Sequence, residues 1–247
     1  MVLAHPMEGP LMPRPTAAPA LSGSAPGTET GTRRTRPFPH VVLGPGALLG
    51  AAATARLTAT FPAHLLRTAR HRDGGDKTYT VHALTLHRHG TPAPVLDGLD
   101  PVWRAAVNRL TDPAHGALML RLLGLPAAPL DIEVRLTEYR HGGWMSRHTD
   151  RADKAFSQNL YLCPGWLPHW GGGLGLYPTE TAPEPAATFL PGDGNSLAFA
   201  RSEHSWHEVF PVDARARAPR RALLLHAHWA RTGDAGADRS GEASCGS

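Results

Sequence analysis

The chain has 247 residues, of which 41% are hydrophobic and 19% charged, a composition typical of a globular protein with one sizeable core. No apolar run approaches the roughly 20 residues that a membrane-spanning helix needs, and the N-terminus lacks the basic-then-apolar pattern of a secretion signal. The net charge of +4 is modest and the arginines are scattered, so neither a nucleic-acid nor a membrane partner is expected. The two cysteines, Cys163 and Cys245, form no disulfide framework, which suits a reducing cytoplasm.

Local composition divides the chain into three regions. Residues 1–36 are rich in Pro, Ala, Gly, Ser and Thr and are predicted to be a disordered N-terminal arm. Residues 232–247 form a tail of Gly, Asp and Ser that is also predicted to be disordered. Between them, residues 37–231 are expected to form one domain, with helical support over about 45–125 and a β-core over about 130–229.

The first half of this domain carries mostly helical signals. An Ala-rich apolar segment with helical character begins at Ala47, whereas the alternation over Thr78–Leu86 predicts a strand. Asp100, followed by a proline, has the pattern of a helix cap and predicts a helix that runs to about Leu110. A second, Leu-rich helix is predicted over Ala114–Leu123, where a glycine ends it. These helices are expected to support a sheet.

From Leu130 onward the hydrophobic period changes to two. Asp131–Tyr139 alternates between polar and apolar residues, as a strand with one buried face does. Further β-rich segments, separated by Gly, Pro and Asp turns, cover residues 144–150, 157–162, 174–177, 187–190, 196–200, 206–212 and 220–229. About six to eight short strands in this arrangement predict a sandwich or a barrel.

A His-x-Asp motif at His148 and Asp150, with the later His207, carries the strongest chemical signal. Two histidines and one carboxylate bind Fe(II) on one face and leave positions open for a cosubstrate and O2. Residues i and i+2 of a strand share a face, so His148 and Asp150 could reach one metal, with His207 on a strand alongside. A similar pair within His71–Asp73 leads into a glycine turn and is interpreted as an exposed loop. His204 is the alternative third ligand.

Several further motifs follow one another in a recognisable order. They are Tyr139 before a glycine turn, the His-x-Asp motif, Tyr161-Leu162 before Trp166, a Gly-Gly pair within 171–173, Pro191-Gly192-Asp193-Gly194-Asn195-Ser196, Trp206-His207-Glu208-Val209 and Arg220-Arg221-Ala222. With this order, residues 130–229 resemble the prolyl-4-hydroxylase-like branch of the Fe(II)/2-oxoglutarate dioxygenases. The resemblance implies a mainly β fold with N-terminal helices, the double-stranded β-helix or jelly roll that cupins also have.

The resemblance also implies roles for individual residues. The His-x-Asp motif and His207 would bind Fe(II), and Arg220 would pair with the distal carboxylate of 2-oxoglutarate. Tyr161 would hydrogen-bond the same carboxylate, and Tyr139 would line the pocket. Alanine stands where the family often has the serine of Arg-x-Ser, so that hydroxyl is missing. Because neighbouring residues of a strand face opposite sides, only one of Arg220 and Arg221 can point inward; Arg220 is favoured, with Arg221 facing solvent.

Other residues near these motifs are candidates for contact with the substrate. The candidates are Arg147, Arg151, Lys154, Asn159, His226 and His228. The first four flank the iron motif and could bind an anionic substrate or form a solvated face. The two histidines share a face with Arg220 on a regular strand, where they could line the substrate pocket or be half-buried and hydrogen-bonded.

The resemblance implies hydroxylation of an unactivated C–H bond in an amino acid, a peptide residue or a related small molecule, with succinate and CO2 as coproducts. Fe(II), 2-oxoglutarate and O2 would be required, with ascorbate as a reductant. Natural-product tailoring is an expected setting. Two alternatives stay open: a cupin-type Zn or Ni enzyme that does not use 2-oxoglutarate, and a 2-oxoglutarate-dependent demethylase. A non-catalytic binding module is disfavoured because the ligand set and the arginine are intact.

Overall fold

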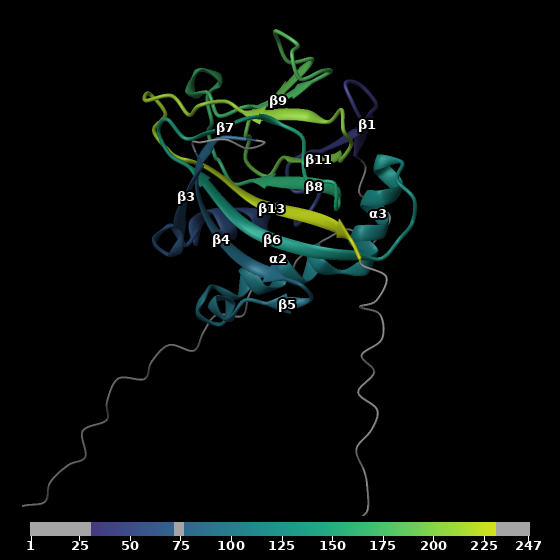
Figure 1. Cartoon of the computed structure of the whole chain (residues 1–247). Helices are drawn as coiled ribbons and strands as arrows, with labels where there is room; N and C mark the ends of the chain where they lie inside the picture. The colour runs from purple at the N-terminus through teal and green to yellow at the C-terminus, as the bar shows by residue number, and fades with distance from the viewer. Residues whose placement is uncertain (1–30, 72–76, 231–247) are drawn as a thin grey trace, which may run out of the picture.

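The structure, a computed structural model, describes residues 31–71 and 77–230, and its main feature is a curled antiparallel sheet (Figure 1). Its strands are β1 (Thr32–Arg34), β2 (His40–Leu43), β3 (Arg67–His71), β4 (Tyr79–Arg88), β5 (Thr91–Pro92), β6 (Leu130–Tyr139), β7 (Trp144–His148), β8 (Lys154–Tyr161), β9 (Leu174–Tyr177), β10 (Ala187–Phe189), β11 (Ser196–Ala200), β12 (Trp206–Val209) and β13 (Arg220–Trp229). They follow the order β1-β2-β11-β8-β13-β6-β4-β7-β12-β9-β10, and β3 and β5 pair with β4 outside this path.

The three α-helices of the described chain precede β6 in the sequence: α1 (Ala51–Ala59), α2 (Pro101–Thr111) and α3 (Pro113–Leu123). The 3-10 turns are η1 (Ala63–Leu65) and η2 (Pro94–Gly98), which also precede β6, and η3 (Pro168–Trp170), which follows β8. The carboxylate of Asp100 accepts a hydrogen bond from the Val102 amide at 3.0 Å, which caps α2 as predicted. Gly124 ends α3 in the left-handed region with φ of 73°, so the predicted C-terminal glycine is confirmed.

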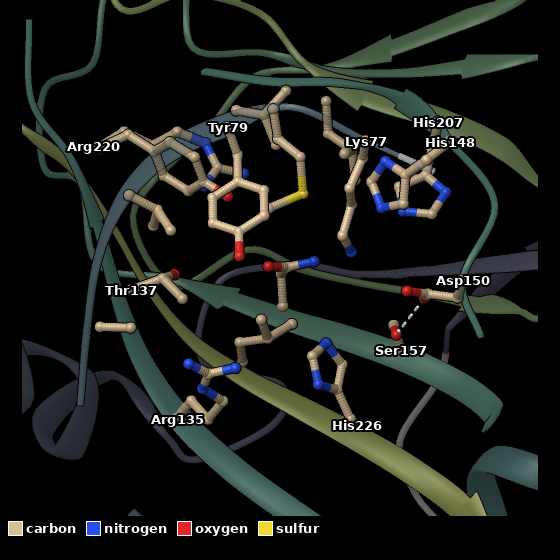
Figure 2. Close-up of a pocket in the computed structure, with 18 of the residues that line it drawn as sticks. Lys77, Tyr79, Arg135, Thr137, His148, Asp150, Ser157, His207, Arg220 and His226 are labelled. Carbon is tan, nitrogen blue, oxygen red and sulfur yellow. Dashed lines mark hydrogen bonds between the residues drawn. The ribbon is translucent and has the colours of Figure 1, made fainter. Parts of the chain in front are cut away.

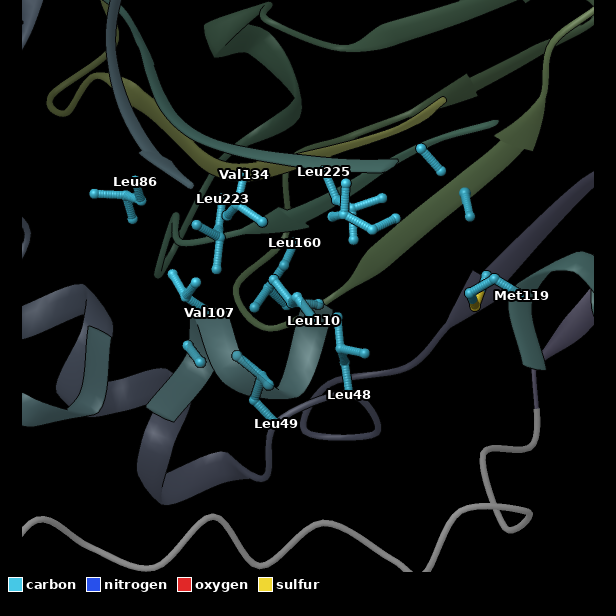
Figure 3. Packing of buried hydrophobic residues seen from close by; sticks show 14 of the residues in the cluster. Leu48, Leu49, Leu86, Val107, Leu110, Met119, Val134, Leu160, Leu223 and Leu225 are labelled. Atoms are coloured by element: carbon cyan, nitrogen blue, oxygen red, sulfur yellow. The ribbon is translucent and has the colours of Figure 1, made fainter. Parts of the chain in front are cut away.

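The hydrophobic core lies between the helices and one face of the sheet (Figure 3). Leu223 and Leu225 of β13 belong to this core, together with Val107 and Leu110 of α2. Alternate residues of the same strand point the other way, because side chains along a strand alternate between faces. The opposite face of the sheet therefore remains free to form a pocket, and a smaller apolar cluster that includes Val209 lies on that side.

The predicted mainly β fold with N-terminal helices is confirmed, with one correction. The arm predicted over 1–36 extends too far, because its residues Thr32–Arg34 form β1 and pair with β2. The strand predicted over Thr78–Leu86 is observed as β4, a central strand that pairs with β6 and β7. Residues 1–30 and the tail predicted over 232–247 lie outside the described residues. Across the described ranges, no helix combines the length and apolarity needed to cross a membrane.

Candidate active site and metal centre

The inner face of the curled sheet holds a pocket to which strands distant in the sequence contribute (Figure 2). The described residues that line it are Ala69, Lys77, Tyr79, Val81, Ala83, Arg135, Thr137, Tyr139, Met145, His148, Asp150, Ser157, Asn159, Leu174, Phe199, His207, Val209, Arg220, Leu224 and His226. His148, His207 and Asp150 lie on one side of this pocket, and Arg220 lies on the other (Figure 2). Tyr79 and Lys77 are seen between the two groups in the view of Figure 2.

Three potential metal ligands meet on the first of these sides. His148 is the last residue of β7 and stands directly opposite His207 of β12 in the strand pairing. Asp150 follows two residues after His148, just beyond the strand. One ligand atom from each residue lies within 4.8 Å of the others, and all three side chains are buried. The predicted convergence of the His-x-Asp motif and His207 is thus observed, although β7 ends before Asp150.

Backbone carbonyl groups fix the orientation of both imidazoles. Nδ1 of His148 donates to the Ser146 carbonyl at 2.8 Å, and Nδ1 of His207 donates to the Ser205 carbonyl at 2.9 Å. A carbonyl oxygen can only accept, so Nδ1 carries the proton and Nε2 is left as an electron-pair donor, as in a metal-binding histidine. Burial, reinforced by the neighbouring His207, lowers the pKa of His148 to about 2; burial also lowers the pKa of His207. Both rings are therefore neutral, as metal ligands must be.

Asp150 is held as a carboxylate by two neighbours from β8. Its Oδ1 accepts a hydrogen bond from Nζ of Lys154 at 2.7 Å, and its Oδ2 accepts one from Oγ of Ser157 at 2.7 Å. Burial by itself raises the pKa of Asp150, but the Lys154 ammonium outweighs burial and holds the pKa well below its usual range. Lys154, weighed from the sequence as a substrate contact, thus serves as the partner of Asp150.

Glu133, His226 and His228 form a second group whose ligand atoms also lie within 4.8 Å of one another. These side chains are only half-buried and already pair with other groups. Glu133 lies 3.3 Å from Nδ1 of His226 and 3.8 Å from Arg88, and His228 lies 3.3 Å from Asp153. Their nitrogen atoms face carboxylates instead of being set by backbone carbonyls. His148, Asp150 and His207 therefore form the better metal site.

Arg220 lies on the opposite side of the pocket with only 1% of its surface exposed. Its Nε donates to the Gly172 carbonyl at 2.8 Å, and its guanidinium carbon is 5.0 and 5.1 Å from the ring centroids of Tyr139 and Tyr161. No carboxylate of the described residues pairs with it. The Tyr161 hydroxyl is buried and has no hydrogen-bond partner of good geometry in the described ranges. A buried cation beside an unsatisfied hydroxyl fits a carboxylate ligand.

Comparison with known proteins decides the family. Residues 134–224 match the family described as the 2OG-Fe(II) oxygenase superfamily, and this range includes the three potential metal ligands and Arg220. This part of the chain is thus similar to the 2OG-Fe(II) oxygenases. The resemblance stated from the sequence is thereby confirmed, and with it the enzymatic class. No curated protein sequence matches the chain.

Solved structures of 2OG-Fe(II) oxygenases share the fold. An oxidoreductase of this family from Burkholderia pseudomallei is 22% identical, with 76% of this chain and 84% of that chain covered and a TM-score of 0.55. A prolyl hydroxylase from Trichoplax adhaerens, solved with a peptide fragment of hypoxia inducible factor, is 16% identical, with coverage of 76% and 83% and a TM-score of 0.51. SnoN, a non-heme alpha ketoglutarate dependent epimerase from nogalamycin biosynthesis, is 16% identical, with coverage of 83% and 89% and a TM-score of 0.51. The predicted jelly-roll fold is confirmed.

Oxygenases of this family require Fe(II), 2-oxoglutarate and O2. The residues present fit these groups: two neutral histidines and a carboxylate suit Fe(II), and the guanidinium without a counter-charge suits the free carboxylate of 2-oxoglutarate. The predicted choice between the two neighbouring arginines also agrees with the geometry. Arg220 lines the pocket, whereas Arg221 points to the opposite face of β13.

Arg221 does not simply face solvent, as expected from the sequence. Its Nε donates to the buried carboxylate of Glu138 at 2.9 Å, and its guanidinium carbon lies 4.5 Å from the centroid of the Phe61 ring. Arg140 pairs with the same carboxylate at 2.7 Å. The second arginine of Arg-Arg-Ala therefore ties the sheet to the segment after α1 and is no part of the pocket.

The substrate candidates named from the sequence separate into two groups. Asn159 and His226 line the pocket. Arg147, Arg151 and His228 are not among the described residues that line it. Arg147 donates to the Glu180 and Ala182 carbonyls at 2.5 and 2.7 Å and lies over the Tyr177 ring. Arg151 is exposed and pairs with Asp153 at 2.7 Å, and His228 approaches the same carboxylate at 3.3 Å. His204, the alternative metal ligand, is exposed and lies outside the potential ligand sets.

Sequence reasoning missed Arg135 among the residues of the pocket. A signal for Arg135 was present in the sequence. It stands four residues before Tyr139 in the alternating strand β6, so the two side chains must share a face. Lys77 and Tyr79 also line the pocket, where the pairing of β4 with β7 places their segment.

Proposed function

We propose that this oxygenase hydroxylates an unactivated C–H bond of an amino acid, a peptide residue or a related small molecule. His148, Asp150 and His207 hold Fe(II), and Arg220 with Tyr161 holds the distal carboxylate of 2-oxoglutarate, with Tyr139 as a wall. The observation that carries the proposal is the buried Arg220, which has no described counter-charge and shares one pocket with the potential metal ligands. Natural-product tailoring in the cytoplasm is the proposed setting, with ascorbate as a reductant.

When bound, Fe(II) and 2-oxoglutarate supply the oxidation of the C–H bond by O2, with release of succinate and CO2. The protein supplies position and charge. Fixed Nδ1 hydrogen bonds hold His148 and His207 with Nε2 available, and Lys154 keeps Asp150 ionised. A planar guanidinium at Arg220 can receive a carboxylate through two parallel hydrogen bonds, which fixes the orientation of the cosubstrate. Apolar residues that also line the pocket lower the local dielectric and so strengthen both interactions.

Two alternatives are weighed against the same residues. A cupin-type Zn or Ni enzyme would use the three metal ligands but would leave the buried Arg220 guanidinium without a counter-charge among the described residues, which is costly. A demethylase would use the same cosubstrate and differ only in releasing formaldehyde. The fold serves both a prolyl hydroxylase and an epimerase, so the fold by itself leaves the reaction outcome open.

Anaerobic spectroscopy tests the two halves of the proposed site separately. The purified protein receives Fe(II) and then 2-oxoglutarate while the visible spectrum is recorded for the charge-transfer band of an iron-chelated keto acid. The wild type should develop the band, His148→Ala should not, and Arg220→Gln should need about 30-fold or more 2-oxoglutarate, as expected when a buried charge pair loses one partner. Arg221→Gln is the matched control, because this neighbour lies on the other face.

Two results would contradict the proposal. The first is a wild-type protein that binds iron yet gives no band at saturating 2-oxoglutarate, which would favour the cupin-type alternative. The second is His148→Ala protein that still converts 2-oxoglutarate to succinate at the wild-type rate. Circular dichroism of each variant confirms that the fold is intact.

A further inference from the structure

A second arginine of the pocket, Arg135 in the middle of β6, has no part in the proposed metal and cosubstrate sites. Its side chain points into the cavity (Figure 2). Its Nε is buried and has no hydrogen-bond partner among the described residues, and no described carboxylate forms an ion pair with it. The residue as a whole is half-buried, but leaving its buried N–H without a partner is costly, so a pocket with such a group calls for a ligand that completes it.

Glu133 does not serve as that partner. It precedes Arg135 by two residues on the same face of β6, and the positive charge of Arg135 contributes to lowering its pKa. However, Glu133 lies 3.3 Å from Nδ1 of His226 and 3.8 Å from Arg88, and it forms no ion pair with Arg135. The hydrogen bond from His226 is the main reason why the pKa of Glu133 is lowered to about 2. The nearby carboxylate is therefore ionised but engaged elsewhere.

The strand pairing separates Arg135 from the proposed cosubstrate site. Arg220 stands opposite Tyr139 at the end of β6, and Arg135 lies four residues earlier on that strand. Four residues of a strand span roughly 13 Å. Leu224 stands opposite Arg135 on one side and Asn159 on the other, so these three form a row across β6, β13 and β8. Asn159, which also lines the pocket, supplies a neutral amide at the other end of this row.

The charge of the pocket favours an anionic occupant. Among the described lining residues, Lys77, Arg135 and Arg220 are cationic and only Asp150 is anionic. Bound Fe(II) and the dianion of 2-oxoglutarate carry opposite charges that cancel, so the pocket stays positive with both in place. A neutral substrate would leave Arg135 desolvated and unpaired. A carboxylate would satisfy it through the two parallel hydrogen bonds that a guanidinium offers.

We propose that Arg135 binds a carboxylate of the substrate, with Asn159 across the row as a second polar contact, so that the substrate is a small carboxylic acid such as an amino acid derivative with its carboxylate free. This inference rests on the proposed function and sharpens it, because the main chain of an internal peptide residue has no carboxylate. The substrate and the cosubstrate would then use different arginines of the same pocket.

Calorimetry with matched probes tests the inference. The probes are the N-acetyl-L-amino acids and free L-amino acids, each compared with its own carboxamide, and they are titrated anaerobically into protein supplied with Fe(II) and 2-oxoglutarate. At least one acid should bind about 30-fold or more tightly than its amide. Arg135→Gln should abolish this preference, Arg135→Lys should retain part of it, and the 2-oxoglutarate affinity should stay within about twofold of wild type. Arg88→Gln, which removes an exposed arginine, should keep the preference.

Three outcomes would overturn the inference: no acid binds better than its amide, Arg135→Gln keeps the wild-type preference, or Arg135→Gln weakens 2-oxoglutarate as much as Arg220→Gln does. The last outcome would assign Arg135 to the cosubstrate. Failure of the proposed function gives a different result: wild-type protein then shows no charge-transfer band, however the probes bind. If wild-type protein develops the charge-transfer band but no acid binds better than its amide, only the carboxylate subsite is rejected.

Discussion

The two faces of the central strands β6, β8 and β13 differ in what they bury. On β13, Leu223 and Leu225 pack against the helices, whereas Arg220, Leu224 and His226 line the pocket. Both faces are built by the same alternation along the same strands. The helix-covered face is mainly apolar, and groups buried there, such as the Glu138 carboxylate and the Gln158 amide, meet partners across elements, although Nδ1 of His115 has none among the described residues. The pocket face keeps buried polar groups whose partners are absent from the described chain.

Pairs on the helix-covered face illustrate the difference. Nε2 of His115 in α3 lies 2.9 Å from the side-chain oxygen of Gln158 in β8, and Arg221 pairs with Glu138. On the pocket face, Nε of Arg135 and the hydroxyl of Tyr161 are buried without such partners. One face therefore provides stability, and the other gives up some stability to keep groups available for ligands.

Truncation of adjacent leucines on β13 should separate the two faces most strongly. Leu225→Ala removes a fully buried side chain from the main core and should lower the free energy of unfolding by about 2–5 kcal/mol. Leu224→Ala truncates a partly buried residue that borders the pocket, where space already exists, so the loss should be roughly 1 kcal/mol. Urea denaturation of both variants measures the difference.

Binding should show the reverse order for these two variants. Leu225→Ala should keep the wild-type affinity for 2-oxoglutarate at temperatures where it is folded, because its side chain does not reach the pocket. Leu224→Ala should alter binding of the substrate. Equal losses of stability in the two variants would contradict the view that one face stabilises the fold while the other binds ligands.

The next effect concerns acid stability and the buried histidine of α3. Burial lowers the pKa of His115 from 6.5 to about 4, although the hydrogen bond with Gln158 raises it. In the unfolded chain His115 therefore binds a proton as the pH falls below about 6.5, whereas in the folded chain it does so only near pH 4. Stability from this residue is complete above pH 6.5 and is lost as the pH falls toward 4, by about 3 kcal/mol.

His115→Gln keeps an amide that can donate to Gln158 but cannot titrate in this range. The free energy of unfolding of the variant should fall less than that of wild type between pH 7 and pH 4, and the difference between the two curves isolates His115. Parallel curves would mean that the pKa of His115 does not differ between the folded and the unfolded protein. The histidines of the pocket are present in both proteins, so their contribution cancels when the two curves are compared.

Much of the division between the helix-covered face and the pocket face could be predicted from the sequence, because strand alternation and helix caps depend on residues close together in the chain. The period-two pattern of Asp131–Tyr139 predicts β6, and Asp100 predicts the start of α2. The spacing of His148 and Asp150 predicts that they converge, since two residues of separation return to one face of an extended chain. These features depend on neighbours within a few positions, which the sequence displays directly.

Features that depend on strand register were not predictable in this way. Arg147 and Arg151 flank the iron motif in sequence, but their side chains bind the 180–182 loop and Asp153 outside the pocket. Conversely, Lys77 reaches the pocket only because β4 pairs with β7. β1 was taken as disordered because a three-residue exposed strand has no periodic signal and forms only through its partner β2.

The smallest of these effects concerns a single hydroxyl on the pocket face. Oγ of Ser157 donates to Oδ2 of Asp150 at 2.7 Å and helps to orient the proposed metal ligand. Loss of such an outer contact typically weakens metal binding by about 10–100-fold. Ser157→Ala should therefore lower the Fe(II) affinity by this factor, measured by anaerobic titration, with little change in unfolding. Ser196→Ala is the control, because this buried serine hydrogen-bonds Gln158 and does not touch Asp150. If both variants bind iron as wild type does, the Lys154 ion pair is sufficient to orient Asp150, and the pocket face depends less on its hydroxyl groups than its geometry indicates.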